Sequence, residues 1–104
     1  MDKESARIAS KFAKNIRKKF KINKIILFGS RARGDNLLNS DFDFLVVSSD
    51  FEGVFFTDRI AKLYLFWEDY PLNVEPLCYT PKEFKIKLNS FGIVRTAVKE
   101  GIEI

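Results

Sequence analysis

An apolar run at 25–28 stops at Gly29 and Ser30, and this junction constrains the fold more than any other part of the chain. The run contains β-branched residues and is bounded at its end, which is typical of a buried strand. A glycine in that place lets backbone N–H groups approach a phosphate, and the serine adds a hydroxyl donor. Residues 30–33 can begin a short helix, whose first N–H groups favour an anion, and Gly34 can end it. The junction therefore predicts a strand, a phosphate-binding turn and a short helix.

Ten residues separate Ser30 from Asp41, where acidic and apolar residues begin to alternate. Segment 41–47 predicts a second strand, and because side chains alternate across a strand, Asp41 and Asp43 share one face. The other face points into a core and carries Phe42, Phe44 and Val46. Two carboxylates side by side on a buried strand repel each other unless a cation lies between them. Magnesium suits this pair because it binds carboxylate oxygens together with substrate phosphates.

A third carboxylate fits the same site. Segment 72–79 predicts another strand, and Glu75 is the only charged residue within it. On a strand beside the two aspartates, Glu75 would complete a cage of three carboxylates that can hold two metal ions. The alternative for Glu75 is an ordinary glutamate at the edge of a strand.

At these residues the chain resembles the nucleotidyltransferase superfamily typified by DNA polymerase β, and within it the minimal nucleotidyltransferases of bacteria and archaea. Those proteins pair with HEPN-domain proteins in toxin–antitoxin operons. The family pattern of Gly-Ser, two aspartates one residue apart and a third acidic residue is matched by Gly29, Ser30, Asp41, Asp43 and Glu75. Segments 29–35, 40–43 and 94–101 are also similar to that family, so the resemblance covers nearly the whole chain. The third acidic residue is often aspartate in the family and is glutamate here.

The resemblance implies the palm-like nucleotidyltransferase fold and a metal-dependent transfer of AMP from ATP. Asp41, Asp43 and Glu75 would be the catalytic residues and would hold two Mg²⁺ ions. The implied acceptor is a hydroxyl on a partner protein, a tyrosine of a HEPN toxin, which the transfer neutralises.

The resemblance also implies the nucleotide-binding residues. Gly29 and Ser30 would hold the β- and γ-phosphates, and Ser40 belongs to the matching segment 40–43. Arg31 or Arg33 could neutralise the charge of the leaving pyrophosphate, with a surface role as the alternative for either.

Size and composition limit the remaining choices. With 104 residues, 46% of them apolar, the chain predicts one minimal nucleotidyltransferase domain over 1–104 with one core. No apolar run is long enough for a membrane span, no secretory signal is visible, and the single cysteine, Cys78, excludes an internal disulfide and is expected in a buried strand. These features favour a cytoplasmic protein. Histidine is absent from the sequence, so catalysis would have to use carboxylates and metal.

The positive charge is concentrated in the first helix. Residues 1–24 hold nine of the eighteen basic residues and only two acidic ones. Segment 2–20 predicts an amphipathic helix, whose apolar stripe consists of Ala9, Phe12, Ala13, Ile16 and Phe20. Its basic side chains form either a solvated face or an electrostatic surface for RNA or an acidic partner.

The remaining pattern predicts further helices and loops. Loops are expected at 36–40 and 49–53, and a helix at 55–67 with Ile60, Leu63, Tyr64 and Trp67 on its inner face. Phe56, Leu65 and Phe66 leave other faces of that helix apolar, which favours a protein interface. Thr80, Pro81 and Glu83 predict the capped start of a helix that ends near 88 or 89. A last helix is expected at 91–100. The order predicts an α/β fold with a small mixed sheet and flanking helices.

Three functions are compatible with these observations. The first is an antitoxin that transfers AMP to a protein, since no residues are left over for an acceptor-binding domain. The second is a nucleotidyltransferase that acts on a small molecule or an RNA end, which the basic helix would favour. The third is a non-catalytic antitoxin that keeps the fold and neutralises its partner only by binding.

Overall fold

The computed structural model describes residues 1–64 and 74–104, apart from the side chain of Glu75. In chain order the elements are α1 (Lys3–Lys19), β1 (Ile22–Phe28), α2 (Ser30–Arg33), β2 (Phe42–Ser48), the 3-10 turn η1 (Ser49–Phe51), α3 (Phe56–Tyr64), β3 (Val74–Tyr79), α4 (Pro81–Leu88), α5 (Ile93–Glu100) and β4 (Ile102–Glu103).

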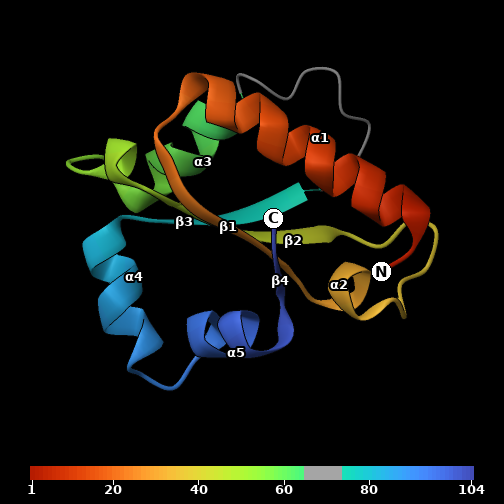
Figure 1. Ribbon diagram of the computed structural model, residues 1–104. Coiled ribbons are helices and arrows are strands. Elements are labelled where there is room, and N and C mark those ends of the chain that lie inside the picture. The colour runs from red at the N-terminus through yellow and green to blue at the C-terminus, as the bar shows by residue number, and fades with distance from the viewer. Residues whose placement is uncertain (65–73) are drawn as a thin grey trace.

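The described strands form one mixed sheet in the order β3-β2-β1-β4. β1 pairs antiparallel with β2 and with β4, whereas β2 and β3 are parallel and are connected through α3. Helices α1 and α3 cover one face of this sheet, and α4 and α5 cover the other (Figure 1). The expected α/β fold, a small mixed sheet with flanking helices, is confirmed.

The core between α1 and the sheet follows the predicted apolar patterns. Phe42, Phe44 and Val46 of β2 are fully buried and belong to the same cluster as the apolar stripe of α1. Phe12 of α1 stacks on Phe44, with ring centroids 4.1 Å apart. Since a buried aromatic side chain contributes several kcal/mol by area alone, this pair fixes how α1 crosses the sheet.

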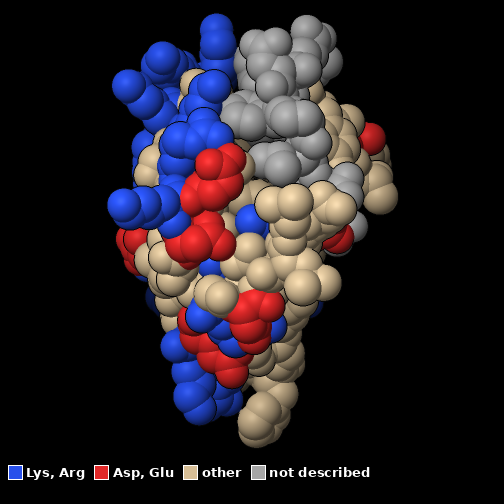
Figure 2. Space-filling view, turned by 90° about the vertical axis from the view of Figure 1, so that its right-hand side faces the viewer, with Lys and Arg blue, Asp and Glu red and all other residues tan. Residues whose placement is uncertain are grey.

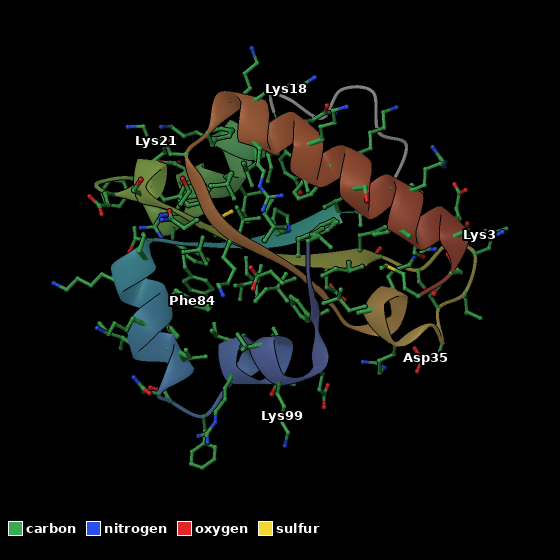
Figure 3. All side chains as sticks on the ribbon, in the orientation of Figure 1. Lys3, Lys18, Lys21, Asp35, Phe84 and Lys99 are labelled. Atoms are coloured by element: carbon green, nitrogen blue, oxygen red, sulfur yellow. The ribbon has the colours of Figure 1, made fainter. Side chains whose placement is uncertain are left out.

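The opposite face of β2 is also buried, because α4 and α5 cover it. Leu45 and Val47 lie in a second cluster with Val94 and Ala97 of α5. Phe84 packs against this cluster from α4 (Figure 3). β2 is therefore apolar on both faces from Phe44 to Val47, and its one acidic residue, Asp43, lies near its N-terminal end.

The polar side of α1 carries the positive charge. Lys11, Lys14, Arg17, Lys18 and Lys19 are all exposed. Figure 2 views the end of the molecule near α2 and the N-terminus, and Lys and Arg side chains gather at its upper left, on the α1 side. Among the described residues, no helix is long and apolar enough to cross a membrane.

The inner face of α3 differs from the prediction. Tyr64 is 50% exposed, so its predicted place on the inner face is wrong, whereas Leu63 is fully buried as expected. Arg59 is 5% exposed and takes an inward position, because its guanidinium donates to the carbonyls of Val54 and Cys78 at 3.0 and 3.2 Å. Leu65, Phe66 and Trp67, which the sequence placed in the same helix, lie outside the described residues.

The C-terminal elements also differ slightly. α5 begins at Ile93, two residues later than predicted, and Phe91 before it is 95% exposed. The two-residue strand β4 was not predicted, and it pairs with Ile26 and Leu27 of β1. Cys78 is fully buried in β3 as expected, and burial raises the pKa of its thiol to about 12.

The start of α4 confirms the predicted cap. Thr80 Oγ1 accepts from the Glu83 N–H at 3.1 Å, and the Glu83 carboxylate accepts from the Thr80 N–H at 2.9 Å. The same carboxylate pairs with the buried guanidinium of Arg59 on α3. Glu83 therefore connects α3 to α4 and also accepts a hydrogen bond from the backbone N–H of the α4 cap, Thr80.

We expect Glu83→Gln to lower stability by roughly 1–2 kcal/mol at neutral pH, because the charged hydrogen bonds to Arg59 are weakened at a partly exposed site. The Arg59 guanidinium, followed by the Thr80 N–H, lowers the pKa of Glu83 below its ordinary 4.5. Its contribution is therefore present above about pH 4.5 and is lost as pH falls through the lowered pKa. Thermal melting of both proteins across this range should show the difference in Tm shrink toward acid. Glu100→Gln, at an exposed position, removes the same charge and is the control. An equal difference at all pH values would contradict the role of the charge.

Candidate active site

The turn at Gly29 joins the end of β1 to the start of α2. Its backbone angles, φ 75° and ψ −158°, lie in a region that essentially only glycine occupies. A Cβ at this position would collide with a carboxylate oxygen of Asp43, and the Asp43 Cγ would lie only 3.3 Å away. The missing side chain leaves room for this carboxylate, so the two halves of the sequence motif are in contact.

Strand register places the acidic positions beside one another. Asp43 is paired with Phe28 of β1, the residue before Gly29, and with Glu75 of β3 on its other side. Asp43 is half-buried, and so is Asp41, which lies directly before β2 rather than within it. The shared face of the two aspartates therefore stays a prediction.

The third predicted ligand is only partly described. The backbone of Glu75 lies in β3, but its side chain is outside what the structure describes. Among the described side chains, no three His, Cys, Asp or Glu residues form a group that could hold a metal ion. The cage of three carboxylates consequently rests on the register alone.

Arg31 is buried, although a surface role was one of the two alternatives that the sequence allowed for it. It is 3% exposed and stacks over the ring of Phe42, with its guanidinium carbon 4.4 Å from the ring centroid. Its guanidinium donates to the carbonyls of Leu38 and Ser40 and to Ser5 Oγ. The surface alternative for Arg31 is therefore wrong, because the loop 36–40 and α1 enclose the side chain.

The other predicted nucleotide-binding residues lie around the same turn. Arg33 is exposed on α2 and forms an ion pair with Asp35 at 3.1 Å. Ser40 is half-buried, and its Oγ accepts from the Leu37 N–H at 2.8 Å. α2 itself ends at Gly34, which adopts the left-handed conformation as expected.

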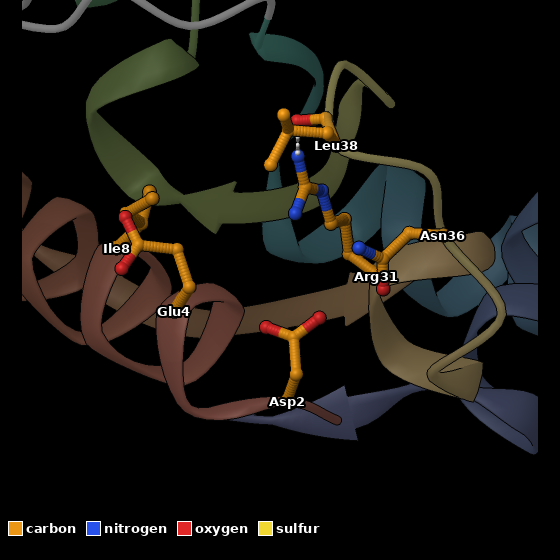
Figure 4. Close-up of a pocket in the computed structure, with 6 residues that line it drawn as sticks. All are labelled: Asp2, Glu4, Ile8, Arg31, Asn36 and Leu38. Carbon is orange, nitrogen blue, oxygen red and sulfur yellow. Dashed lines mark hydrogen bonds between the residues drawn. The ribbon is translucent and has the colours of Figure 1, made fainter.

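A pocket of about 370 Å³ lies beside Arg31 and is lined by Asp2, Glu4, Ile8, Arg31, Asn36 and Leu38 (Figure 4). Asp2 caps α1, because its carboxylate accepts from the Ser5 N–H at 2.6 Å. This backbone hydrogen bond is the main cause that lowers the pKa of Asp2 below its ordinary value. The pocket gives the solvent access to one edge of an otherwise buried arginine.

Sequence reasoning missed Ser5 and the carbonyls of Leu38 and Ser40 as partners of Arg31. Backbone carbonyls carry no signal in a sequence, and Ser5 precedes Arg31 by 26 residues. Phe42 was predicted as a core residue, but its second role as the surface under a guanidinium was not. The one hint in the sequence that Arg31 supports Asp41 was that segments 29–35 and 40–43 belong to the same motif.

Comparison with known proteins identifies the class of protein. Residues 9–104 match the model of the nucleotidyltransferase domain, so the chain belongs to that family and is an enzyme that transfers nucleotides. It is 35% identical over 104 residues to a protein of Methanocaldococcus jannaschii that carries the name "putative protein adenylyltransferase", and the match covers 97% of this chain and 96% of that protein. It also resembles the crystal structure of a "putative nucleotidyltransferase" from Sulfolobus solfataricus. That match has a TM-score of 0.67 at 24% identity, covers 96% of this chain and 78% of the other, and supports the fold.

Nucleotidyltransferase domains use a nucleoside triphosphate and a divalent metal, and the residues present fit such a metal. The Asp43 carboxylate takes up the space that a Cβ of Gly29 would fill, so its oxygens lie directly against the turn. Asp41 and Asp43 are hard oxygen donors of the kind that Mg²⁺ prefers, and the Asp43 carboxylate lies against a turn suited to phosphate.

We expect Gly29→Ala to reduce nucleotidyl transfer by about 100-fold, because the new Cβ must displace the Asp43 carboxylate. Its backbone strain should also cost roughly 1–3 kcal/mol of stability. Gly53→Ala is the matched control: Gly53 has φ +74°, but a Cβ there would meet nothing within 4 Å. Both variants should melt earlier than wild type, and only Gly29→Ala should lose activity per folded molecule. Equal activity in the two variants would show that the contact with Asp43 is unimportant.

Proposed function

We propose that this protein transfers AMP from ATP to a hydroxyl group on a partner protein, and that residues 1–104 act as one minimal nucleotidyltransferase domain. The observation that carries the proposal is the contact between Gly29 and Asp43, which puts the phosphate turn against the acidic strand. The protein acceptor and the AMP group are supported by the relative from Methanocaldococcus jannaschii, whose name is that of a protein adenylyltransferase.

The proposed reaction is an exchange at phosphorus. The acceptor oxygen forms a bond to the α-phosphorus while the bond between that phosphorus and the β-phosphate oxygen breaks, and pyrophosphate leaves. The hydroxyl proton goes to Glu75 or to water. Since the chain has no histidine, a carboxylate is the available base at this site.

Asp41, Asp43 and Glu75 would hold the divalent cations, with Mg²⁺ as the proposed metal. When bound, such cations stabilise the negative charge on the phosphates and lower the pKa of the attacking hydroxyl. The contribution of the protein is to fix the carboxylates. Asp43 is held between β1 and β3, and Glu75 enters the proposal through its place in register beside Asp43.

The nucleotide would lie against the turn after β1. Gly29 and Ser30 are proposed to hold the β- and γ-phosphates, with Ser40 at the edge of the site. Arg33 is exposed on α2 and is the arginine proposed to reach the pyrophosphate, although it would first have to leave Asp35. Arg31 is not included, because its guanidinium already donates to groups within the protein.

The proposed partner is a HEPN-domain toxin, as the family resemblance implies. Apolar side chains near the start of α3 support a protein-binding surface: Phe55 is 81% exposed and Phe56 44%. Phe56 also lines a pocket of about 300 Å³ together with Tyr79, Glu83 and Lys87. Phe66 and Trp67, which the sequence suggested for the same surface, lie outside the described residues.

A second candidate function is transfer to an RNA end or a small molecule. The exposed basic side chains of α1, seen for Lys3 and Lys18 in Figure 3, favour an acidic acceptor such as RNA. Added salt distinguishes the two, because screening weakens binding through exposed charges and hardly affects apolar contacts.

Asp41→Asn and Asp43→Asn should each lower AMP transfer by about 100-fold or more without loss of stability, because the substitution removes a repelling charge from the unliganded site. Transfer of labelled AMP in the presence of Mg²⁺, together with thermal melting, tests both points. Asp58→Asn on the exposed side of α3 is the control and should transfer at the wild-type rate. The same assay on Glu75→Gln tests the third ligand. A wild-type rate in either aspartate variant would remove that residue from the site.

The acceptor is tested by the intact mass of a HEPN-domain protein co-expressed with this chain. We expect the partner to gain whole nucleotide-monophosphate units with the wild-type chain and none with Asp43→Asn, because the gain requires catalysis. A partner that is neutralised without any gain in mass would instead support a non-catalytic antitoxin. An RNA that gains the label while the partner does not would support the second candidate function.

A further inference from the structure

Arg31 is fully engaged inside the protein although it lies in the phosphate-binding turn. Nε donates to the Ser40 carbonyl at 3.2 Å, Nη1 donates to Ser5 Oγ at 3.2 Å, and Nη2 donates to the carbonyls of Leu38 and Ser40 at 3.1 and 3.0 Å. All three nitrogens therefore have partners, and the side chain is 3% exposed. The Nε–H and both N–H groups of Nη2 could therefore bind a phosphate only by breaking these bonds.

The contacts of Arg31 lie on both sides of Asp41. The Ser40 carbonyl belongs to the peptide group that ends at the Asp41 nitrogen, and it accepts from two guanidinium nitrogens. Because a peptide group is planar, fixing its carbonyl also fixes the direction of the bond that leads to Asp41. On the other side, the guanidinium covers the ring of Phe42 at 4.4 Å.

We infer that Arg31 is a positioning residue that sets the orientation of the Asp41 carboxylate for metal binding, rather than a phosphate contact. This inference rests on the proposed metal role of Asp41. Arg31 extends from α2 to the loop 36–40. That loop leads into β2 through Ser40, whose carbonyl accepts from the guanidinium. The planar fork of arginine suits this task because it reaches two carbonyls and stacks on a ring at the same time.

The far end of β2 provides a matched control within the same chain. Arg59 is 5% exposed, donates to the carbonyls of Val54 and Cys78, and lies over Phe51 at 6.0 Å. Phe51, like Phe42, is fully buried. Arg59→Lys and Phe51→Leu therefore damage a similar buried arginine and ring without touching the peptide before Asp41.

The pocket beside Arg31 makes chemical rescue feasible. Figure 4 shows the Arg31 side chain facing the pocket together with Asp2, Glu4 and Asn36, with the hydrogen bond to Leu38 drawn. If the side chain is shortened, a small cation can enter from this side and occupy the place of the guanidinium. Methylguanidinium has the required planar fork, whereas methylammonium has the charge without the fork.

The test measures Mn²⁺ binding without nucleotide, by electron paramagnetic resonance of the free ion, in wild type, Arg31→Lys and Arg59→Lys. A lost positioning contact typically lowers metal affinity by about 10- to 100-fold. We expect this loss for Arg31→Lys only, although both variants should melt earlier. Methylguanidinium, and not methylammonium, should restore Mn²⁺ binding and AMP transfer to Arg31→Ala. A phosphate contact would instead raise the KM for ATP and leave Mn²⁺ binding unchanged.

Mn²⁺ affinity in Arg31→Lys that equals wild type, or falls no further than in Arg59→Lys, would overturn the inference. If Arg31→Lys does not fold, Phe42→Leu is compared with its control Phe51→Leu instead. A lower Mn²⁺ affinity in Phe42→Leu than in Phe51→Leu supports the inference, and equal affinities overturn it. Asp41→Asn and Asp43→Asn separate this result from the proposed function. Should those variants bind Mn²⁺ as wild type does, the proposed metal site itself fails. If the two aspartate variants lose Mn²⁺ binding while the Arg31 and Phe42 variants keep it, only the positioning role of Arg31 fails.

Discussion

The close approach of Gly29 to the carboxylate of Asp43 is the constraint on which the site depends. It requires a backbone conformation that glycine alone adopts readily and a strand register in which Asp43 lies opposite Phe28. A shift of one residue in that register would turn Asp43 toward the core and an apolar neighbour toward the turn. The apolar pattern of β2 therefore secures the chemistry indirectly, because burial of Phe42 and Phe44 against α1 prevents such a shift.

The two ends of β2 use the same physical device for different purposes. At each end a buried arginine donates to backbone carbonyls and lies over a buried phenylalanine, Arg31 over Phe42 and Arg59 over Phe51. Arg59 also pairs with Glu83, so its charge is neutralised, and this ion pair joins α3 to α4. The hydrogen bonds of Arg31 described above go to neutral oxygens, and acidic groups, Asp2 among them, line the pocket beside it. Burying a cation in this way is costly unless several hydrogen bonds satisfy it, which explains why all its nitrogens are used.

The sequence predicted the parts of the fold whose signals are local. The stripe of α1, the strands that end at Phe28 and begin near Asp41, and the cap at Thr80 all depend on neighbouring residues, and all are confirmed. β4 was missed because two residues are too few to show a period.

The inner face of α3 was misjudged for a different reason. Arginine is rarely buried, and the carbonyls that accept from Arg59 come from β3 and from the loop before the helix. The motif residues could be proposed from sequence because their spacing carries the chemistry, but the support under Asp41 could not. That support is made of carbonyls and a distant serine, and it exists only after the chain has folded.

The short helix α2 explains why one arginine can affect both halves of the site. A helix of four residues has no stability of its own, so its position must come from tertiary contacts. Its buried side chains are Arg31 and Ala32, and the arginine provides its hydrogen bonds to α1 and to the loop 36–40. The proposed phosphate-binding turn at the start of α2 and the strand that begins after Asp41 thus both depend on contacts of Arg31. In so small a domain one arginine can therefore help to hold both the turn, through α2, and the peptide group before Asp41.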